Sequence, residues 1–161
     1  MKKYELTSES KISFGRKLYR IRALVAFSDV EKGELGGYIE KEENLDQSGN
    51  AWVSDNAEVF GNAKVFGNAW VSDNARVFGD AWVFDNVRVF GDAWVFDNAR
   101  VSGNAWVSDN VEVFGNAWVF GNAWVSDNAR VFGNARVSGN AWVSGNAWVS
   151  GDAEGYKIEI E

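Results

Sequence analysis

Small apolar residues recur with a period of six along most of this chain. From residue 49 to residue 156, eighteen six-residue units carry Ala at the third position, except at Val87 and Val111, and Val at the fifth position in seventeen units. The fourth position accepts Trp, Arg, Lys and Glu, and the sixth accepts Phe, Ser and Tyr. A position that accepts both Trp and Arg faces water, because a buried arginine without a partner is very costly. Since side chains alternate along a strand, each unit predicts a short strand with Ala and Val inside and the fourth and sixth positions outside.

The first two positions of each unit predict a corner. They hold Gly or Asp followed by Asn or Asp, and these residues tolerate the positive φ angles that tight corners require. Short strands that bend once in every unit complete their backbone hydrogen bonds by stacking turn upon turn. The pattern therefore predicts an all-β parallel β-helix.

The segment from Val59 to Lys64, with the order Val-x-Gly-Asn-Ala-x, resembles the hexapeptide repeat of left-handed parallel β-helix proteins. The resemblance covers residues 49–156. It implies a left-handed solenoid in which three consecutive units form one triangular coil. The eighteen units then give about six coils.

The two ends of the chain lack the repeat. Residues 1–48 are expected to form an N-terminal β cap, because the open end of a solenoid exposes unpaired strand edges. Within it, residues 4–7 and 17–27 are expected to contain strands, and the glycines at 36–37 a turn. Residues 157–161 are expected to form a charged C-terminal edge strand that discourages further pairing.

Part of the N-terminal segment also carries a resemblance. Residues 18–24, 36–40 and 43–45 are similar to the leader that precedes such repeats in uncharacterised bacterial and phage-borne hexapeptide-repeat proteins. That resemblance implies no particular activity.

The outward positions form three columns, because every third unit lies on the same face. One column is dominated by tryptophan and is the candidate binding surface: Trp52, Trp70, Arg88, Trp106, Trp124 and Trp142. Neighbours about 5 Å apart can stack, and Arg88 is expected to form cation–π contacts with Trp70 and Trp106. Five exposed tryptophans are more than a monomer usually leaves in water, which favours a surface for another subunit, a partner protein or a sugar. The structural alternative is an aromatic ladder that only shields strand edges.

The second column predicts ion pairs between neighbouring coils, Glu58 with Arg76 and Glu112 with Arg130. The third mixes Lys, Trp and Arg and looks like an ordinary exterior. The asparagines of the second repeat position are expected to form a hydrogen-bonded ladder along the corners.

Four corner aspartates form two pairs that lie one coil apart. They are Asp55 with Asp73, and Asp109 with Asp127. Stacked carboxylates can bind Ca²⁺, which takes six to eight oxygen ligands. Aspartate also serves as an ordinary turn residue, and the nearby arginines neutralise its charge. We therefore expect no metal and no cofactor, and calcium at these four residues is the alternative.

Composition narrows the function classes. The chain contains no Pro, Cys or His, so it has no thiolate nucleophile, no Cys-ligated zinc and no imidazole base. Its net charge of −7 has the wrong sign for binding nucleic acid. No stretch reaches the roughly 20 apolar residues of a membrane span, and the first residues lack a signal core. We expect a cytoplasmic protein with neither a nucleic-acid nor a membrane partner.

The function predicted from these features is structural. Relatives of this fold include acyltransferases and carbonic anhydrases, whose known catalysis depends on His, and the uninterrupted repeat leaves no insertion to shape a pocket. We therefore expect a non-catalytic scaffold or protein-interaction module that binds itself or another protein through its aromatic face. Carbohydrate binding on the Trp column is the alternative, followed by an acyltransferase-like enzyme or ice binding. The sequence does not name the partner.

Overall fold

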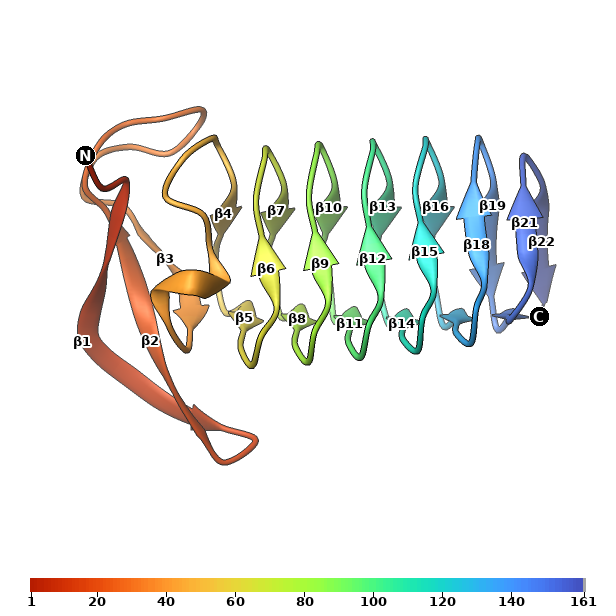
Figure 1. The fold of residues 1–161 in the computed structure, drawn as a ribbon, viewed down its shortest axis with the longest axis horizontal. Helices are drawn as coiled ribbons and strands as arrows, with labels where there is room; N and C mark the ends of the chain where they lie inside the picture. Colours follow the sequence, from red (N-terminus) through yellow and green to blue (C-terminus); the bar gives the residue numbers. More distant parts are fainter. Residues whose placement is uncertain (161) are drawn as a thin grey trace.

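The computed structural model describes residues 1–160, which form an all-β parallel solenoid (Figure 1). Short strands recur once in every repeat unit and lie in three sheets that run along the solenoid. The only helical element in these residues is the 3-10 turn η1 (Glu42–Asn44). No helix in this part of the chain is long and apolar enough to cross a bilayer.

The strands are distributed over the three sheets in a regular order. The nine-stranded sheet contains β1 (Tyr4–Ser13), β2 (Arg16–Ala23), β3 (Leu35–Ile39), β5 (Glu58–Val59), β8 (Arg76–Val77), β11 (Trp94–Val95), β14 (Glu112–Val113), β17 (Arg130–Val131) and β20 (Trp148–Val149). The seven-stranded sheet contains β4 (Trp52–Val53), β7 (Trp70–Val71), β10 (Arg88–Val89), β13 (Trp106–Val107), β16 (Trp124–Val125), β19 (Trp142–Gly145) and β22 (Lys157–Ile160). The six-stranded sheet contains β6 (Lys64–Val65), β9 (Trp82–Val83), β12 (Arg100–Val101), β15 (Trp118–Val119), β18 (Arg136–Ser138) and β21 (Asp152–Glu154).

Within the repeat, each strand pairs in parallel with the strand one turn further along the chain. Trp52 lies opposite Trp70 and Val53 opposite Val71, so one turn takes three repeat units. Outside the strands the ladder continues, and the backbone N–H of Trp52 donates to the carbonyl oxygen of Ala69 at 2.9 Å. The predicted coil of three units is confirmed. The left-handed winding stays a prediction from the resemblance.

The stack is longer than the repeat. The sequence predicts about six coils, whereas the seven-stranded sheet shows about seven turns. Segments outside the repeat add the difference: Tyr38 of β3 lies opposite Glu58, and Lys157 of β22 lies opposite Trp142. Parallel pairing requires only backbone donors and acceptors, so segments without the six-residue motif can join the stack.

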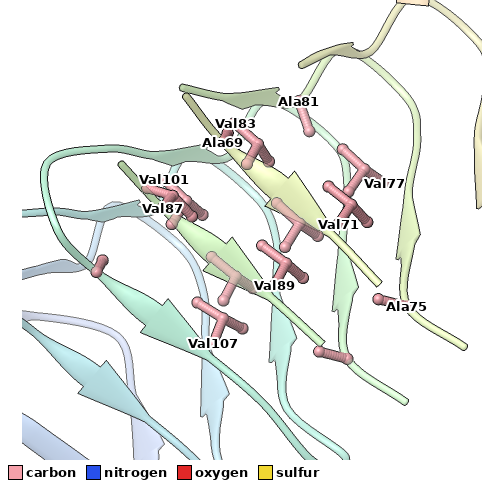
Figure 2. Close-up of a cluster of buried hydrophobic side chains, with 14 of the residues drawn as sticks. Ala69, Val71, Ala75, Val77, Ala81, Val83, Val87, Val89, Val101 and Val107 are labelled. Atoms are coloured by element: carbon pink, nitrogen blue, oxygen red, sulfur yellow. The ribbon is translucent and has the colours of Figure 1, made fainter. Parts of the chain in front are cut away.

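The interior is filled by the third and fifth positions of each unit. In Figure 2, the labelled alanines and valines of successive turns point into the space between the sheets. Every Ala or Val at these two positions is buried, and the most exposed, Val149, reaches only 6%. The predicted inward orientation of Ala and Val is confirmed.

The corners combine an unusual backbone with polar ladders. The Asp residues at the first position adopt positive φ angles, for example 57° at Asp55 and 58° at Asp73. At the second position, Nδ2 of Asn50 donates to Oδ1 of Asn68 at 3.2 Å. The same contact continues along this edge through Asn86, Asn104, Asn122 and Asn140. The predicted asparagine ladder is confirmed.

The N-terminal segment supplies donors to the open side of the first turn. The buried ammonium of Lys3 donates to the carbonyl oxygen of Ala51 at 2.7 Å. The side-chain amide of Asn44, in η1, donates to the carbonyl oxygens of Gly61 and Ala63 at 3.2 and 2.9 Å. These carbonyls have no preceding repeat to bond, so side chains from residues 1–48 take its place.

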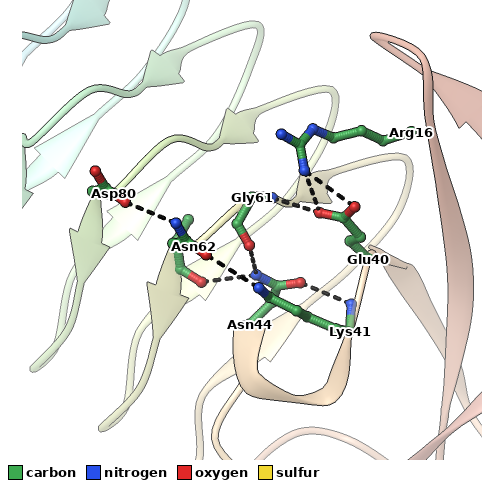
Figure 3. Close-up of polar contacts among 8 residues, drawn as sticks. Arg16, Glu40, Lys41, Asn44, Gly61, Asn62 and Asp80 are labelled. Atoms are coloured by element: carbon green, nitrogen blue, oxygen red, sulfur yellow. Dashed lines mark hydrogen bonds and ion pairs between the residues drawn. The ribbon is translucent and has the colours of Figure 1, made fainter.

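Figure 3 shows further polar contacts at this end of the solenoid. The carboxylate of Glu40 accepts a hydrogen bond from the backbone N–H of Gly61 at 2.8 Å and pairs with Arg16 at 3.0 Å. The ammonium of Lys41 donates to Oδ1 of Asn62 at 3.2 Å, at the start of one corner. Glu40 and Lys41, which directly follow β3, thus tie the N-terminal segment to the corner at Gly61 and Asn62.

The turn expected at residues 36–37 is wrong, because Gly36 and Gly37 lie inside β3. Both are buried against the first turn. A Cβ atom on Gly36 would lie 2.5 Å from the carbonyl oxygen of Val53, and one on Gly37 would lie 2.6 Å from that of Ala57. Glycine is therefore needed here for close approach of β3 to the first turn and not for a bend.

We expect two neighbouring substitutions in the middle of the stack to differ sharply. Val101→Asp places a charge in the closed interior and should lower the free energy of unfolding by more than about 4 kcal/mol. Arg100→Ala removes only exposed cation–π contacts and should cost about 1 kcal/mol. Denaturant unfolding followed by circular dichroism measures both. Equal midpoints for the two variants would contradict the inward and outward assignment.

Lys3 gives the first turn a dependence on pH. Its side chain is 4% exposed, and burial lowers the pKa of its ammonium to about 8, although the Asp46 carboxylate acts in the opposite direction. Between pH 8 and the ordinary lysine value of 10.5, the unfolded chain holds a proton that the folded chain has released. Stability therefore rises with pH in this interval.

We expect the denaturation midpoint of the wild type to rise from pH 8 to pH 9.5 and Lys3→Met to lack this rise. The slope for one proton is at most about 1.4 kcal/mol per pH unit. The range stops at pH 9.5 because burial also raises the pKa of the Tyr4 phenol, which reverses the trend once unfolded tyrosine ionises. Identical pH profiles for wild type and variant would contradict the role of Lys3.

Candidate functional site

The outward side of the seven-stranded sheet carries the predicted binding column, and we call it the tryptophan face. Its fourth-position column consists of Trp52, Trp70, Arg88, Trp106, Trp124 and Trp142, which are neighbours in successive strands. Its sixth-position column consists of Ser54, Ser72, Phe90, Ser108, Ser126 and Ser144. The structure therefore brings all six predicted site residues onto one face.

Three tryptophans of this face form a continuous stack. The ring centroids of Trp106 and Trp124 are 5.0 Å apart with planes inclined by 3°, and those of Trp124 and Trp142 are 5.3 Å apart at 8°. The exposed fraction rises along the stack, from 37% through 41% to 47%. Because the ring faces are turned toward one another, the rings present mainly their edges to solvent.

The prediction that the whole column is exposed is wrong at Trp52. This residue is fully buried, because the rings of Tyr4 and Phe27 pack edge-on against it, with centroids 6.5 and 5.3 Å away. Trp70 is half-buried and packs against the core. The covering residues come from the N-terminal segment, which the repeat pattern cannot anticipate.

Arg88 interrupts the tryptophans between Trp70 and Trp106. Its guanidinium lies 5.9 Å from the Trp70 ring, which confirms one of the two expected cation–π contacts. The second expected contact, with Trp106, does not form. Instead, the ring of Phe90 meets Trp106 edge-on at 5.7 Å. The turn that lacks a tryptophan thus keeps an aromatic ring on the tryptophan face.

The second column confirms both predicted ion pairs. Glu58 lies 3.1 Å from Arg76, and Glu112 lies 3.0 Å from Arg130. In each case the guanidinium also contacts the tryptophan of the following turn at 5.4 to 5.6 Å. Glu, Arg and Trp therefore recur in this order on successive turns.

Glu58 differs from its repeat neighbours because the β1–β2 hairpin covers it. It is only 3% exposed, and Lys11 lies 2.8 Å from its carboxylate. Burial opposes the charged form, but the hydrogen bonds from Lys11 and Ser13 and the charges of Lys11 and Arg76 outweigh it, so the pKa of Glu58 lies below its ordinary value. The carboxylate is a structural anchor for the hairpin.

The same hairpin lies across a ladder of phenylalanines. Phe60, Phe78, Phe96, Phe114 and Phe132 stack with centroids 5.0 to 5.4 Å apart. Phe14, in the turn between β1 and β2, packs on Phe60 and Phe78 at 5.6 and 5.8 Å. Part of this face is thus also covered by the chain's own N-terminal segment.

The third column is more regular than the ordinary exterior expected from the sequence. Cations and tryptophans alternate along it, in the order Lys64, Trp82, Arg100, Trp118 and Arg136, with cation-to-ring distances of 4.7 to 6.0 Å. In the sequence, this order is visible as an alternation of a cationic residue and a tryptophan at the fourth position of every third repeat unit. Each of these cations and rings therefore already has a partner within the chain.

The four aspartates considered for calcium accept hydrogen bonds from the backbone of the next turn. Oδ2 of Asp55 accepts from the backbone N–H of Asp73 at 3.2 Å, and Oδ2 of Asp109 accepts from that of Asp127, also at 3.2 Å. Asp73 and Asp127 likewise accept from the N–H one turn further on. Within residues 1–160, no group of three or more acidic side chains that could hold a metal ion is found. The carboxylates accept backbone hydrogen bonds at the corners, as turn residues do.

One shallow hollow lies at the C-terminal end of the tryptophan face. Its lining includes Trp124, Trp142, Asp127, Lys157 and Glu159. A larger hollow lies beside η1, next to Leu45 and Phe66, away from the tryptophan face. The larger hollow is also lined by the acidic residues Glu42, Glu43 and Asp46 and by Lys64.

The chain is similar to one known family of repeats. The model of the family described as YdcK beta solenoid repeat matches residues 69–84, 93–109, 123–137, 129–145 and 135–151. Each match is nearly one turn long, and all of them lie within the repeat. The likeness supports a solenoid repeat protein and assigns no activity. No curated protein matches the chain.

We expect the two ends of the tryptophan column to respond differently to truncation. Trp52→Ala leaves a cavity under Tyr4 and Phe27 and should lower the free energy of unfolding by about 3–5 kcal/mol. Trp142→Ala removes an exposed ring with one stacking neighbour and should cost about 1 kcal/mol. Denaturant titrations of the two variants make the comparison. A smaller loss for Trp52→Ala than for Trp142→Ala would contradict the burial of the first turn.

Proposed function

We propose that this chain is a non-catalytic, rigid scaffold whose tryptophan face binds protein. The observation that carries the proposal is the exposed stack of Trp106, Trp124 and Trp142 on a regular sheet. Contiguous exposed aromatic surface is typical of protein-binding sites, where Trp and Arg are enriched.

Rigidity is supported by the backbone. Each turn of the repeat bonds to the next through all three sheets, and the corners add ladders of side-chain amides. A surface built on such a frame loses little conformational freedom when a partner binds, which favours its use as a docking platform.

The first turn shows how protein covers this surface. Tyr4 and Phe27 pack edge-on against Trp52 and exclude water from it. Further along the same column, Trp106 and its successors present equivalent rings without such a cover. The chain thus contains an example of the protein contact that we propose for the rest of the face.

Carbohydrate binding, the alternative from the sequence, has less support. Sugars stack on open ring faces, whereas the faces of Trp106 and Trp124 are turned toward each other. A catalytic role also has little support, because the chain has no His or Cys and the uninterrupted repeat carries no insertion to shape a pocket. Ice binding would need a smoother face than one built from Trp and Arg.

A matched pair of variants tests the proposal. Trp124→Glu changes the tryptophan face, and Trp118→Glu makes the same change on the third column, between Arg100 and Arg136. The repeat accepts Glu at the fourth position in Glu58 and Glu112, so both variants should fold. Each is used as tagged bait in extract of the source cells, with quantitative mass spectrometry as the readout.

We expect the wild type and Trp118→Glu to retain at least one protein in common. An untagged copy of this chain counts as such a protein. Its recovery should fall at least about tenfold with Trp124→Glu. Equal recovery of every protein by the three baits would contradict the proposal. A glycan-array signal that only Trp124→Glu abolishes would favour carbohydrate binding instead.

A further inference from the structure

The tryptophan face has an internal complementarity that points to its partner. Its two columns carry unlike side chains at every turn from the third to the seventh, which differ in size at turns four to six and in charge at turns three and seven. Turns four to six pair a tryptophan with a serine: Trp106 with Ser108, Trp124 with Ser126, and Trp142 with Ser144. The third turn pairs Arg88 with Phe90, and β22 adds Lys157 and Glu159 in register with Trp142 and Ser144.

We propose that the tryptophan face binds the same face of a second copy of this chain, with the two solenoids parallel and their turns in register. The inference rests on the proposed function and names the partner. Its physical basis is that one two-fold arrangement sets unlike groups opposite each other at each of these turns.

A two-fold axis that brings one face against its copy lies in the plane of the interface. If the axis runs along the solenoid, between the two columns, each turn faces the same turn of the copy and the columns exchange. Each tryptophan then faces a small serine, and Arg88 faces the ring of Phe90. Lys157 and Glu159 pair at 3.1 Å within each chain. At the end of the stack this ion pair faces its copy in reverse order, so that each ammonium also meets a carboxylate of the other chain.

The other arrangement lacks this complementarity. If the axis runs along the strands, the solenoids are antiparallel and each column faces itself. Bulky tryptophans then oppose tryptophans, and with the axis at Trp124, Arg88 opposes Lys157. Like charges that face each other across an interface are unfavourable. Charge and size therefore favour the parallel arrangement.

The available area indicates a weak dimer. The third to seventh turns span about 24 Å at about 4.8 Å per turn, and the second turn, with Trp70 half-buried, extends this to about 29 Å. One side of the solenoid is about 18 Å wide at about 3 Å per residue. The two copies would bury about 1,000 Å², the lower limit for a specific interface. The N-terminal cover of Trp52 lies on the first turn, outside this region.

Sedimentation velocity over a wide concentration range is the first measurement. The chain of 17.8 kDa should pass from monomer to dimer in the micromolar range as its concentration rises. Trp124→Glu should raise the dissociation constant at least about tenfold, whereas Trp118→Glu should leave it unchanged. A monomer at all concentrations, or a dimer that Trp124→Glu does not weaken, would overturn the inference.

Cross-linking then fixes the arrangement, since the chain has no Cys of its own. Ser108→Cys and Ser144→Cys lie two turns apart, about 10 Å, in the sixth-position column, on either side of Trp124. With a short bismaleimide, each variant should cross-link to itself, and a mixture should give little 108-to-144 product, which the antiparallel arrangement with its axis at Trp124 would favour. If the mixed product dominates, the antiparallel arrangement is right and the inference is wrong.

The outcomes separate this inference from the proposed function. If the chain stays monomeric while the bait experiment recovers a different protein through Trp124, the second copy is excluded as the partner and the protein-binding face stands. If neither self-association nor Trp124-dependent capture occurs, both proposals fail.

Discussion

Backbone hydrogen bonds between successive turns hold this molecule together, and the side chains are selected to permit them. The turns approach closely only if the enclosed side chains are small, which explains the nearly invariant Ala and Val of the interior. The chain must also bend once in every repeat unit, so Gly and Asp occupy the corner positions with positive φ. At the first turn, where no earlier repeat exists, Lys3 and Asn44 donate to the open carbonyls.

The same regularity turns every outward position into a ladder. Parallel in-register stacking puts each side chain about 5 Å from its equivalent in the next turn, so chemistry repeated in every third unit becomes contact. Trp on Trp gives the exposed stack, Arg between tryptophans gives the cation–π series of the third column, and Glu before Arg gives ion pairs. Each exposed contact contributes little by itself, but together they orient long side chains on a uniform surface.

The N-terminal segment decides how much of this surface meets solvent. Its aromatic residues cover Trp52, and its hairpin covers Glu58 and the start of the phenylalanine ladder. The remaining tryptophan face runs from the half-buried Trp70 to Trp142 and becomes more exposed toward the C-terminal end. This division separates the part of the column that stabilises the fold from the part available to a partner.

The sequence by itself determined the inward positions and the corners, because a strict repeat maps directly onto a periodic structure. The resemblance to hexapeptide-repeat proteins supplied the turn of three units. With that turn, the sequence also predicted the grouping of the six site residues on one face and the ion pairs of Glu58 with Arg76 and Glu112 with Arg130. Only the tertiary structure decided that Trp52 is buried, that Gly36 and Gly37 lie in a strand, and that segments at both ends extend the stack. Those features arise from contacts between residues 1–48 and the first turns, or from backbone pairing outside the repeat, and neither leaves a periodic signal in the sequence.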